Sequence, residues 1–137
     1  MRIRVLIISI ALWAATVATA QQQGDPMEGH LFPPELIMKH QQALALTTEQ
    51  RELVKAEVQN AQKRFSDLQW DMQSETEAML SLVRNNRIDE QNVMTQLDKV
   101  LNIEREIKRT QLTLVIRIKN TLTPDQQARL KELRKQE

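Results

Sequence analysis

The stretch "LTTEQ", Leu46 to Gln50, returns with two changes as "LTPDQ", Leu122 to Gln126, and these two copies decide the fold expected of the chain. In each copy a threonine, Thr47 or Thr123, is followed three residues later by a glutamine. This spacing is typical of a capping box, in which the hydroxyl and the glutamine side chain bind backbone amides at a helix start. Each copy therefore predicts the beginning of a helix.

The residues around each box support this prediction. Pro124 falls at the first helical position of the second copy, where its missing N–H group costs nothing. Leu46 and Leu122 precede the two caps, so they are expected to hold the chain against apolar neighbours at each helix start.

Two long helices are predicted between the copies. A heptad pattern runs along the first of them, and eight of its nine positions are apolar, with Glu75 as the exception. The nine positions are Val54, Val58, Ala61, Phe65, Leu68, Met72, Glu75, Met79 and Leu82. The next helix carries its apolar face at Val93, Leu97, Val100, Ile107, Leu114, Ile118 and Leu122.

A short polar turn, residues 84–87, separates these helices, and Asp89 is placed to cap the second one. Helices of similar length joined by such a turn pack as an antiparallel hairpin, with arms of roughly 50 Å at 1.5 Å per residue. A short helix from Glu35 to about Ala45 precedes the hairpin and another follows Thr123. The predicted fold is all-α, a long antiparallel hairpin flanked by two short helices.

The chain is expected to have three parts. Residues 1–20 read as a secretory signal peptide, with Arg2 and Arg4 before an apolar run and Ala18-Thr19-Ala20 at the cleavage site. An uncleaved inner-membrane anchor is the alternative. Residues 21–34, which contain both glycines and three of the four prolines, are predicted to be a flexible leader, and residues 35–137 the four-helix domain.

The composition of the chain excludes several classes of function. Without Arg2 and Arg4, 17 of the 19 basic residues remain against 18 acidic ones, a balance that does not favour nucleic acid as a partner. The sequence has no cysteine, two histidines and two glycines, which excludes thiol chemistry and glycine-rich phosphate loops. We therefore expect a protein that is not an enzyme.

Two features lie off the hairpin contact line. Trp70 stands nearly opposite the apolar stripe of its helix. On the next helix a second row, turned about a third of a revolution from the first, mixes apolar and basic side chains. This row, which we call the mixed strip, consists of Met94, Leu101, Arg105, Lys108, Leu112, Ile116 and Lys119.

Two interpretations of the mixed strip remain open. Its apolar residues, together with Val115, can pack on a flanking helix or on a second copy of the chain. Alternatively, the mixed strip and Trp70 can bind apolar, partly acidic segments of another protein. Because a two-helix hairpin buries little surface for its length, we expect a homodimer.

With the repeated motif, the export signal and the four-helix order, the chain resembles the LTxxQ family of periplasmic proteins over roughly residues 31–134. This family includes Spy-like and CpxP-like members and the metal-responsive CnrX-like and ZraP-like members. The resemblance implies a cradle-like helical dimer in the periplasm. It also implies binding of unfolded clients, as in Spy-like chaperones, or of an inner-membrane stress or metal-signalling partner.

The metal-responsive branch implies an alternative function, a periplasmic heavy-metal sensor or metal-resistance accessory protein. Its CnrX-like members hold a metal through residues of the first and second helices and through a His and a Met late in the hairpin. Here the candidate ligands are His40 and Glu57, for zinc, copper, nickel or cobalt, whereas residues 110–122 contain neither His nor Met. Since two ligands do not close a site, no cofactor is expected in the leading interpretation.

Overall fold

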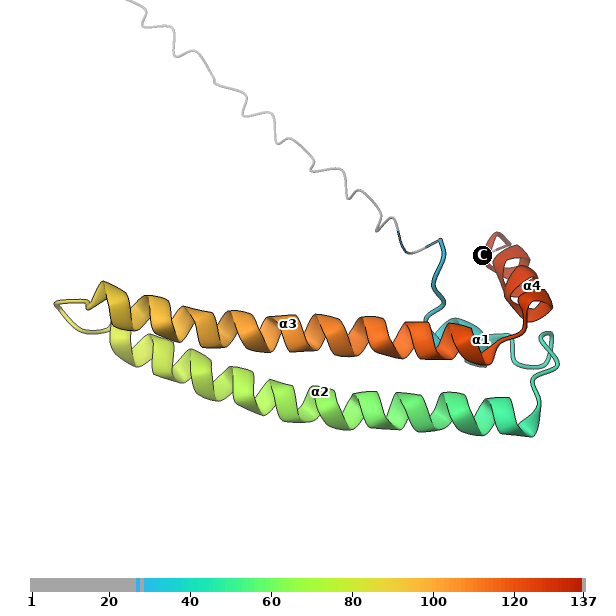
Figure 1. Ribbon diagram of the computed structural model, residues 1–137, viewed down its shortest axis with the longest axis horizontal. Coiled ribbons are helices and arrows are strands. Elements are labelled where there is room, and N and C mark those ends of the chain that lie inside the picture. The colour runs from blue at the N-terminus through green and yellow to red at the C-terminus, as the bar shows by residue number, and fades with distance from the viewer. Residues whose placement is uncertain (1–26, 28, 137) are drawn as a thin grey trace, which may run out of the picture.

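The computed structural model of the protein describes Met27 and residues 29–136. The predicted signal peptide and half of the predicted leader, residues 21–26 and 28, lie outside these residues. The described part of the chain contains four helices and no strand: α1 (Pro34–Lys39), α2 (Thr48–Val83), α3 (Glu90–Thr121) and α4 (Pro124–Arg134). The predicted all-α fold is confirmed (Figure 1).

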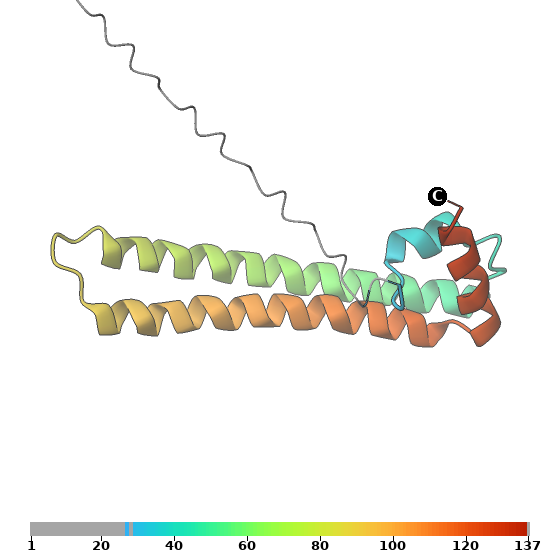
Figure 2. The same ribbon diagram turned by 90° about the horizontal axis from the view of Figure 1, so that it is seen from above.

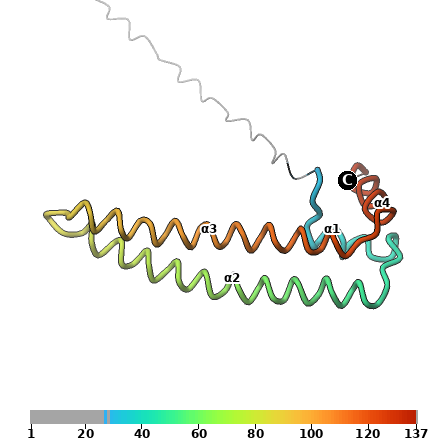
Figure 3. The backbone as a smooth tube through the Cα atoms, in the orientation of Figure 1, coloured from blue at the N-terminus to red at the C-terminus, as the bar shows by residue number. Residues whose placement is uncertain are grey.

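The two long helices form the predicted antiparallel hairpin. Helix α2 has 36 residues and α3 has 32, so each arm is roughly 50 Å long. Figures 1 and 2 show the arms side by side, with α1 and α4 together at one end and the turn between the arms at the other. We call these ends the base and the tip; the backbone trace in Figure 3 follows the chain from one to the other.

Local hydrogen bonds start the helices where the sequence predicts. The Thr47 hydroxyl accepts from the Gln50 amide at 3.1 Å, and the Gln50 side chain accepts from the Thr47 amide at 3.0 Å. Thr123 and Gln126 repeat the arrangement at the start of α4, at 3.2 and 2.9 Å. The Asp89 carboxylate accepts from the Asn92 amide at 3.1 Å and caps α3. Both capping boxes are confirmed.

The contact line between the arms also follows the heptad pattern. All nine α2 positions predicted for it are buried or partly buried. At the polar exception, Gln96 of α3 is buried, and its side-chain amide donates to the Glu75 carbonyl at 2.8 Å and to the Glu75 carboxylate. Lys99 lies 3.9 Å from the same carboxylate. The exception is thus a polar layer whose second member, Gln96, the pattern did not predict.

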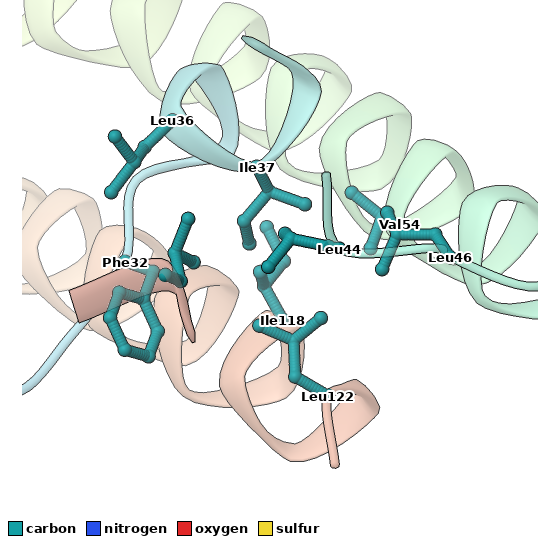
Figure 4. Close-up of a cluster of buried hydrophobic side chains, with 9 residues drawn as sticks. Phe32, Leu36, Ile37, Leu44, Leu46, Val54, Ile118 and Leu122 are labelled. Atoms are coloured by element: carbon teal, nitrogen blue, oxygen red, sulfur yellow. The ribbon is translucent and has the colours of Figure 1, made fainter. Parts of the chain in front are cut away.

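The largest cluster of buried hydrophobic side chains lies at the base, whereas Ala61 and Leu68 are buried farther along the contact line. Figure 4 shows the side chains that meet at the base. They come from the segment before α1, from α1, from the α1–α2 connection, from the base ends of α2 and α3, and from α4. The core cluster consists of Phe32, Leu36, Ile37, Leu44, Leu46, Val54, Ile118, Leu122 and Leu130. Leu46 and Leu122, the first residues of the two motifs, both belong to it, as their place before the caps predicted.

The predicted boundaries at the start of the domain need correction. Helix α1 ends at Lys39 rather than near Ala45, because residues 40–45 form turns in which Ala45 adopts a left-handed conformation, φ 48°. These turns bring Leu44 into the core. Phe32, which the sequence places in the leader, has no exposed surface, so the folded body begins before Glu35. An apolar side chain ahead of Pro33 gave no periodicity from which to predict its burial.

Candidate functional site

The mixed strip faces away from the α2 contact line and stays largely uncovered. Its four apolar residues, Met94, Leu101, Leu112 and Ile116, are between 37% and 49% exposed. They extend the row over most of the arm, from near the tip to near the base. An exposed apolar row of this length on one helix face is the kind of surface that binds another chain.

The basic residues of the mixed strip have no acidic partners. None of Arg105, Lys108 and Lys119 forms an ion pair with any other residue that the structure describes. The Arg105 guanidinium donates only to the Asn102 side chain, at 3.5 Å. The mixed strip therefore combines apolar surface with basic side chains that form no ion pair in the described chain.

The other side of α3 is different. Residues two apart on a helix are about 200° apart around its axis, so Glu106 and Arg117 lie opposite Lys108 and Lys119. There the Arg117 guanidinium donates to the Glu57 carboxylate at 3.0 Å. Arg64 and Arg109 lie 3.8 and 3.7 Å from the Glu106 carboxylate. This paired set lines a hollow of about 260 Å³ between the arms.

At the base, the mixed strip borders a second hollow, with a volume of about 440 Å³. Lys108, Gln111, Leu112 and Val115 line it from α3. Met27, Leu31 and Pro33, which precede α1, line it from the other side. The sequence did not predict this second wall, because these residues fall in the expected leader. The pair Leu31-Phe32 directly before two prolines was the available signal.

Trp70 does not join the mixed strip. Its side chain is 70% exposed, and its position two residues after Leu68 turns it about 160° away from the contact line of α2. It therefore lies on the outer side of α2, as the sequence predicted, at the far edge of the hairpin from α3.

The two sequence motifs meet each other, which the sequence did not predict. The Gln50 side-chain NH2 group donates to the Gln126 side-chain oxygen at 2.7 Å. The Gln126 side-chain NH2 group donates to the Gln50 side-chain oxygen at 3.0 Å. Each side-chain NH2 group also donates to a backbone carbonyl shortly before the other motif. Gln50 donates to the Thr121 carbonyl at 2.9 Å, and Gln126 donates to the Leu44 carbonyl at 3.2 Å. We call this arrangement the glutamine clasp. The repetition of the motif was its only sequence signal.

The first motif also perturbs one acid. Hydrogen bonds, first from the Glu49 backbone amide and then from Thr47, hold the pKa of the Glu49 carboxyl below its usual value, with Arg51 adding to the effect. An acidic residue in the first turn of a helix is favoured by the unpaired amides there. Glu49 is fully exposed, so it supports the helix start and forms no buried site.

A family model for heavy-metal resistance proteins matches residues 5–129. The chain belongs to the heavy-metal resistance family. It falls in the group that contains the Spy-, CpxP- and CnrX-like proteins, as its two LTxxQ copies predicted. No curated protein and no solved structure gave a match to the chain.

In this member of the heavy-metal resistance family, the two candidate metal donors, Glu57 and His40, lie on different helical segments. Glu57 is engaged by Arg117, so a metal ion at its carboxylate would compete with an ion pair. His40 is the C-cap residue of α1, and Leu36, one turn earlier, is buried in the core. Within Met27 and residues 29–136, no three His, Cys, Asp or Glu side chains are grouped so that they can hold a metal ion. The described donors of this family member do not fit a closed metal site.

Among the residues that the structure describes, no helix is both long enough and apolar enough to cross a membrane.

Proposed function

We propose that this member of the heavy-metal resistance family is an exported, non-enzymatic stress protein that acts by contact. Its mixed strip binds apolar, partly acidic segments of other proteins, either unfolded clients or an inner-membrane sensor partner. The comparison supports the family; the choice of a Spy-like or CpxP-like activity within it is our proposal.

One observation carries this proposal, the difference between the two sides of α3. Each arginine on the side of the interarm hollow is ion-paired with Glu57 or Glu106, whereas the basic residues of the mixed strip form no ion pair in the described chain. Unpaired positive charge beside exposed apolar side chains complements a segment that carries both acids and apolar groups. Charge steers such a segment to the mixed strip, and apolar contact then holds it.

Export and self-association belong to the same proposal. The family match includes residues 5–17, the apolar run of the expected signal peptide, which supports export to the periplasm. A homodimer is supported by the distribution of buried side chains, because the core cluster lies at the base and both arms extend well beyond it (Figure 1).

Suppression of client aggregation tests the proposal. We expect the mature protein to suppress aggregation of an unfolding client without added metal. The double variant Leu112→Glu with Ile116→Glu should require about tenfold more protein for the same suppression. Loss of two apolar contacts and repulsion of acidic segments account for at least about 1.4 kcal/mol of binding. Light scattering of a chemically denatured client on dilution measures this.

A matched control shows whether an effect depends on where the two negative charges are added or only on their number. Gln62→Glu with Gln69→Glu adds the same two charges at exposed sites of α2, and it should retain wild-type suppression. Circular dichroism should show that both variants are folded, since the substituted side chains are exposed. If the folded strip variant suppresses aggregation as well as the control does, the mixed strip is not the binding surface.

The family match itself favours one second function, a metal-responsive one. In that case His40 and Glu57 would contribute to a site completed by groups outside the described residues or by a second copy. Calorimetric titration with zinc, copper, nickel and cobalt, repeated on His40→Ala, tests it. Binding tighter than about 10 µM that His40→Ala removes, together with suppression that needs metal, would replace the first proposal by the second.

A further inference from the structure

The hollow at the base of the mixed strip has a fixed wall. Phe32 is fully buried in the core, directly after Leu31, which lines the hollow. The Arg134 guanidinium donates to the Leu31 carbonyl at 2.6 Å and lies 5.1 Å from the centre of the Phe32 ring. Helix α4 thus holds Leu31 and Phe32 in place, so this part of the wall does not depend on a bound partner.

The described lining of the hollow is mostly apolar and contains a basic residue but no acidic one. Apolar side chains form most of its lining, and Lys108 is the one charged residue among those that the structure shows lining it. Lys108 has no ion pair with the described residues. The volume of the hollow, about 440 Å³, is in the range of pockets that hold a small ligand or a large side chain.

The other hollows of the hairpin lack this combination. The interarm hollow is lined by three arginines and two glutamates, and each arginine is ion-paired, two of them with Glu106 and one with Glu57. The hollow between α1 and α2 has apolar walls, but Glu35 and Glu52 stand beside Arg51 and Lys55 on its rim. Of these three hollows, the one at the base of the mixed strip is the one whose described lining includes a basic residue and no acidic residue.

We propose that the hollow at the base of the mixed strip anchors one bulky apolar side chain of a bound segment, with a neighbouring Asp or Glu paired to Lys108. This inference rests on the proposed function and specifies its substrate class, segments in which a large apolar residue is flanked by acids. The rest of the mixed strip, from Arg105 to the tip, then contacts the segment more loosely, because it has no enclosing wall.

Peptide binding tests the anchor directly. A fluorescein-labelled peptide with the core Glu-Phe-Glu is compared by anisotropy with peptides containing Lys-Phe-Lys and Glu-Ala-Glu. We expect the first peptide to bind at least about tenfold more tightly than either of the others, since one charge-assisted hydrogen bond and one buried ring each contribute that much. Equal binding of the Phe and Ala peptides would overturn the anchor.

Reversing the charge at Lys108 tests whether this lysine selects acidic peptides. Lys108→Glu should reverse the preference in favour of Lys-Phe-Lys, whereas Lys63→Glu, an exposed lysine on the outer side of α2, should leave it unchanged. Both changes are at exposed positions, and thermal melts check that each variant is folded. A preference that survives Lys108→Glu, or that Lys63→Glu removes equally, would show that the hollow does not select the acid.

Failure of the anchor and failure of the proposed function give different results. If Met94→Glu with Leu101→Glu abolishes suppression of client aggregation while Lys108→Glu and Leu112→Ala leave it intact, the mixed strip binds clients without the anchor. If none of these folded variants changes suppression, the proposed function fails and the anchor fails with it. Loss of suppression in both sets, with the reversed peptide preference, supports both.

Discussion

At the scale of single residues, the glutamine clasp explains why the chain carries its motif twice. The side-chain oxygens of Gln50 and Gln126 each accept from a backbone amide of their own helix and from the amide of the other glutamine. The same two residues therefore start two helices and join them. Because both are partly buried, removing one leaves the other with unpaired polar groups, which is costly away from water.

A double-mutant cycle tests the clasp. Gln50→Ala and Gln126→Ala should each lower the free energy of unfolding by about 1 to 3 kcal/mol, since each leaves its partner unsatisfied. The double variant should be less destabilised than the sum by at least about 1 kcal/mol, as expected for groups in direct contact.

Chemical denaturation measures these free energies. Gln69→Ala, at an exposed position of α2, serves as the control and should change stability by less than about 0.5 kcal/mol. Additive effects at Gln50 and Gln126 would contradict the clasp.

At the scale of the elements, the polar layer is the weak point of the hairpin contact line. Gln96 donates twice to Glu75, and the exposed Lys99 lies 3.9 Å from the same carboxylate. Such a layer contributes less than apolar packing would, but it favours one register, because any shift between the arms leaves these groups unpaired.

Two substitutions at this layer should act in opposite directions. Gln96→Ala should lower the free energy of unfolding by about 1 to 3 kcal/mol, because Glu75 loses its amide donor inside the contact line. Glu75→Leu with Gln96→Leu should raise it by about 1 kcal/mol, because an apolar pair replaces a desolvated polar one. Thermal unfolding followed by circular dichroism ranks the stabilities of the wild-type protein and the two variants. A double variant less stable than Gln96→Ala would contradict this description of the layer.

At the scale of the whole molecule, stability and function lie at different places. The core cluster holds the base, whereas large apolar side chains near the tip are 36% to 52% exposed. These are Leu80, Val83, Ile88, Met94 and Leu97. A hairpin with one contact line and an uncovered tip is expected to open locally at lower free energy than the base does.

Hydrogen exchange as a function of concentration tests this distribution and the proposed homodimer together. At low concentration, amides near Val54 and Ile118 should exchange most slowly, and those of residues 70–103 much faster. At high concentration, protection of residues 70–103 should increase, because a second copy covers the arms. Protection of the distal arms that is independent of concentration would contradict dimerisation through them.

Much of this fold follows from local sequence. A capping box needs only residues three apart, and a heptad contact line needs only the spacing of apolar residues, so the helix starts at Thr47 and Thr123 and the hairpin were predictable. The end of α1, the burial of Phe32 and the clasp depend on segments far apart in the chain. No local pattern encodes which glutamine meets which.

The candidate site was predictable in part for the same reason. Helical periodicity placed the mixed strip off the contact line, and its exposure agrees with that placement. Whether its cations are paired, and whether a hollow lies at its base, depends on the position of Glu57, of Glu106 and of the segment before α1. Charge pairing across two arms requires the register, which only the folded chain provides.

Site-specific photo-crosslinking tests whether the mixed strip is the surface that contacts other proteins. A photoreactive phenylalanine analogue at Leu101, in the mixed strip, is compared with one at Thr113, which lines the interarm hollow on the other side of α3. With an unfolding client and no added metal, we predict crosslinks to the client from position 101 and few from position 113. Equal crosslinking from both positions, or crosslinking from position 113 alone, would show that the mixed strip is not the contact surface.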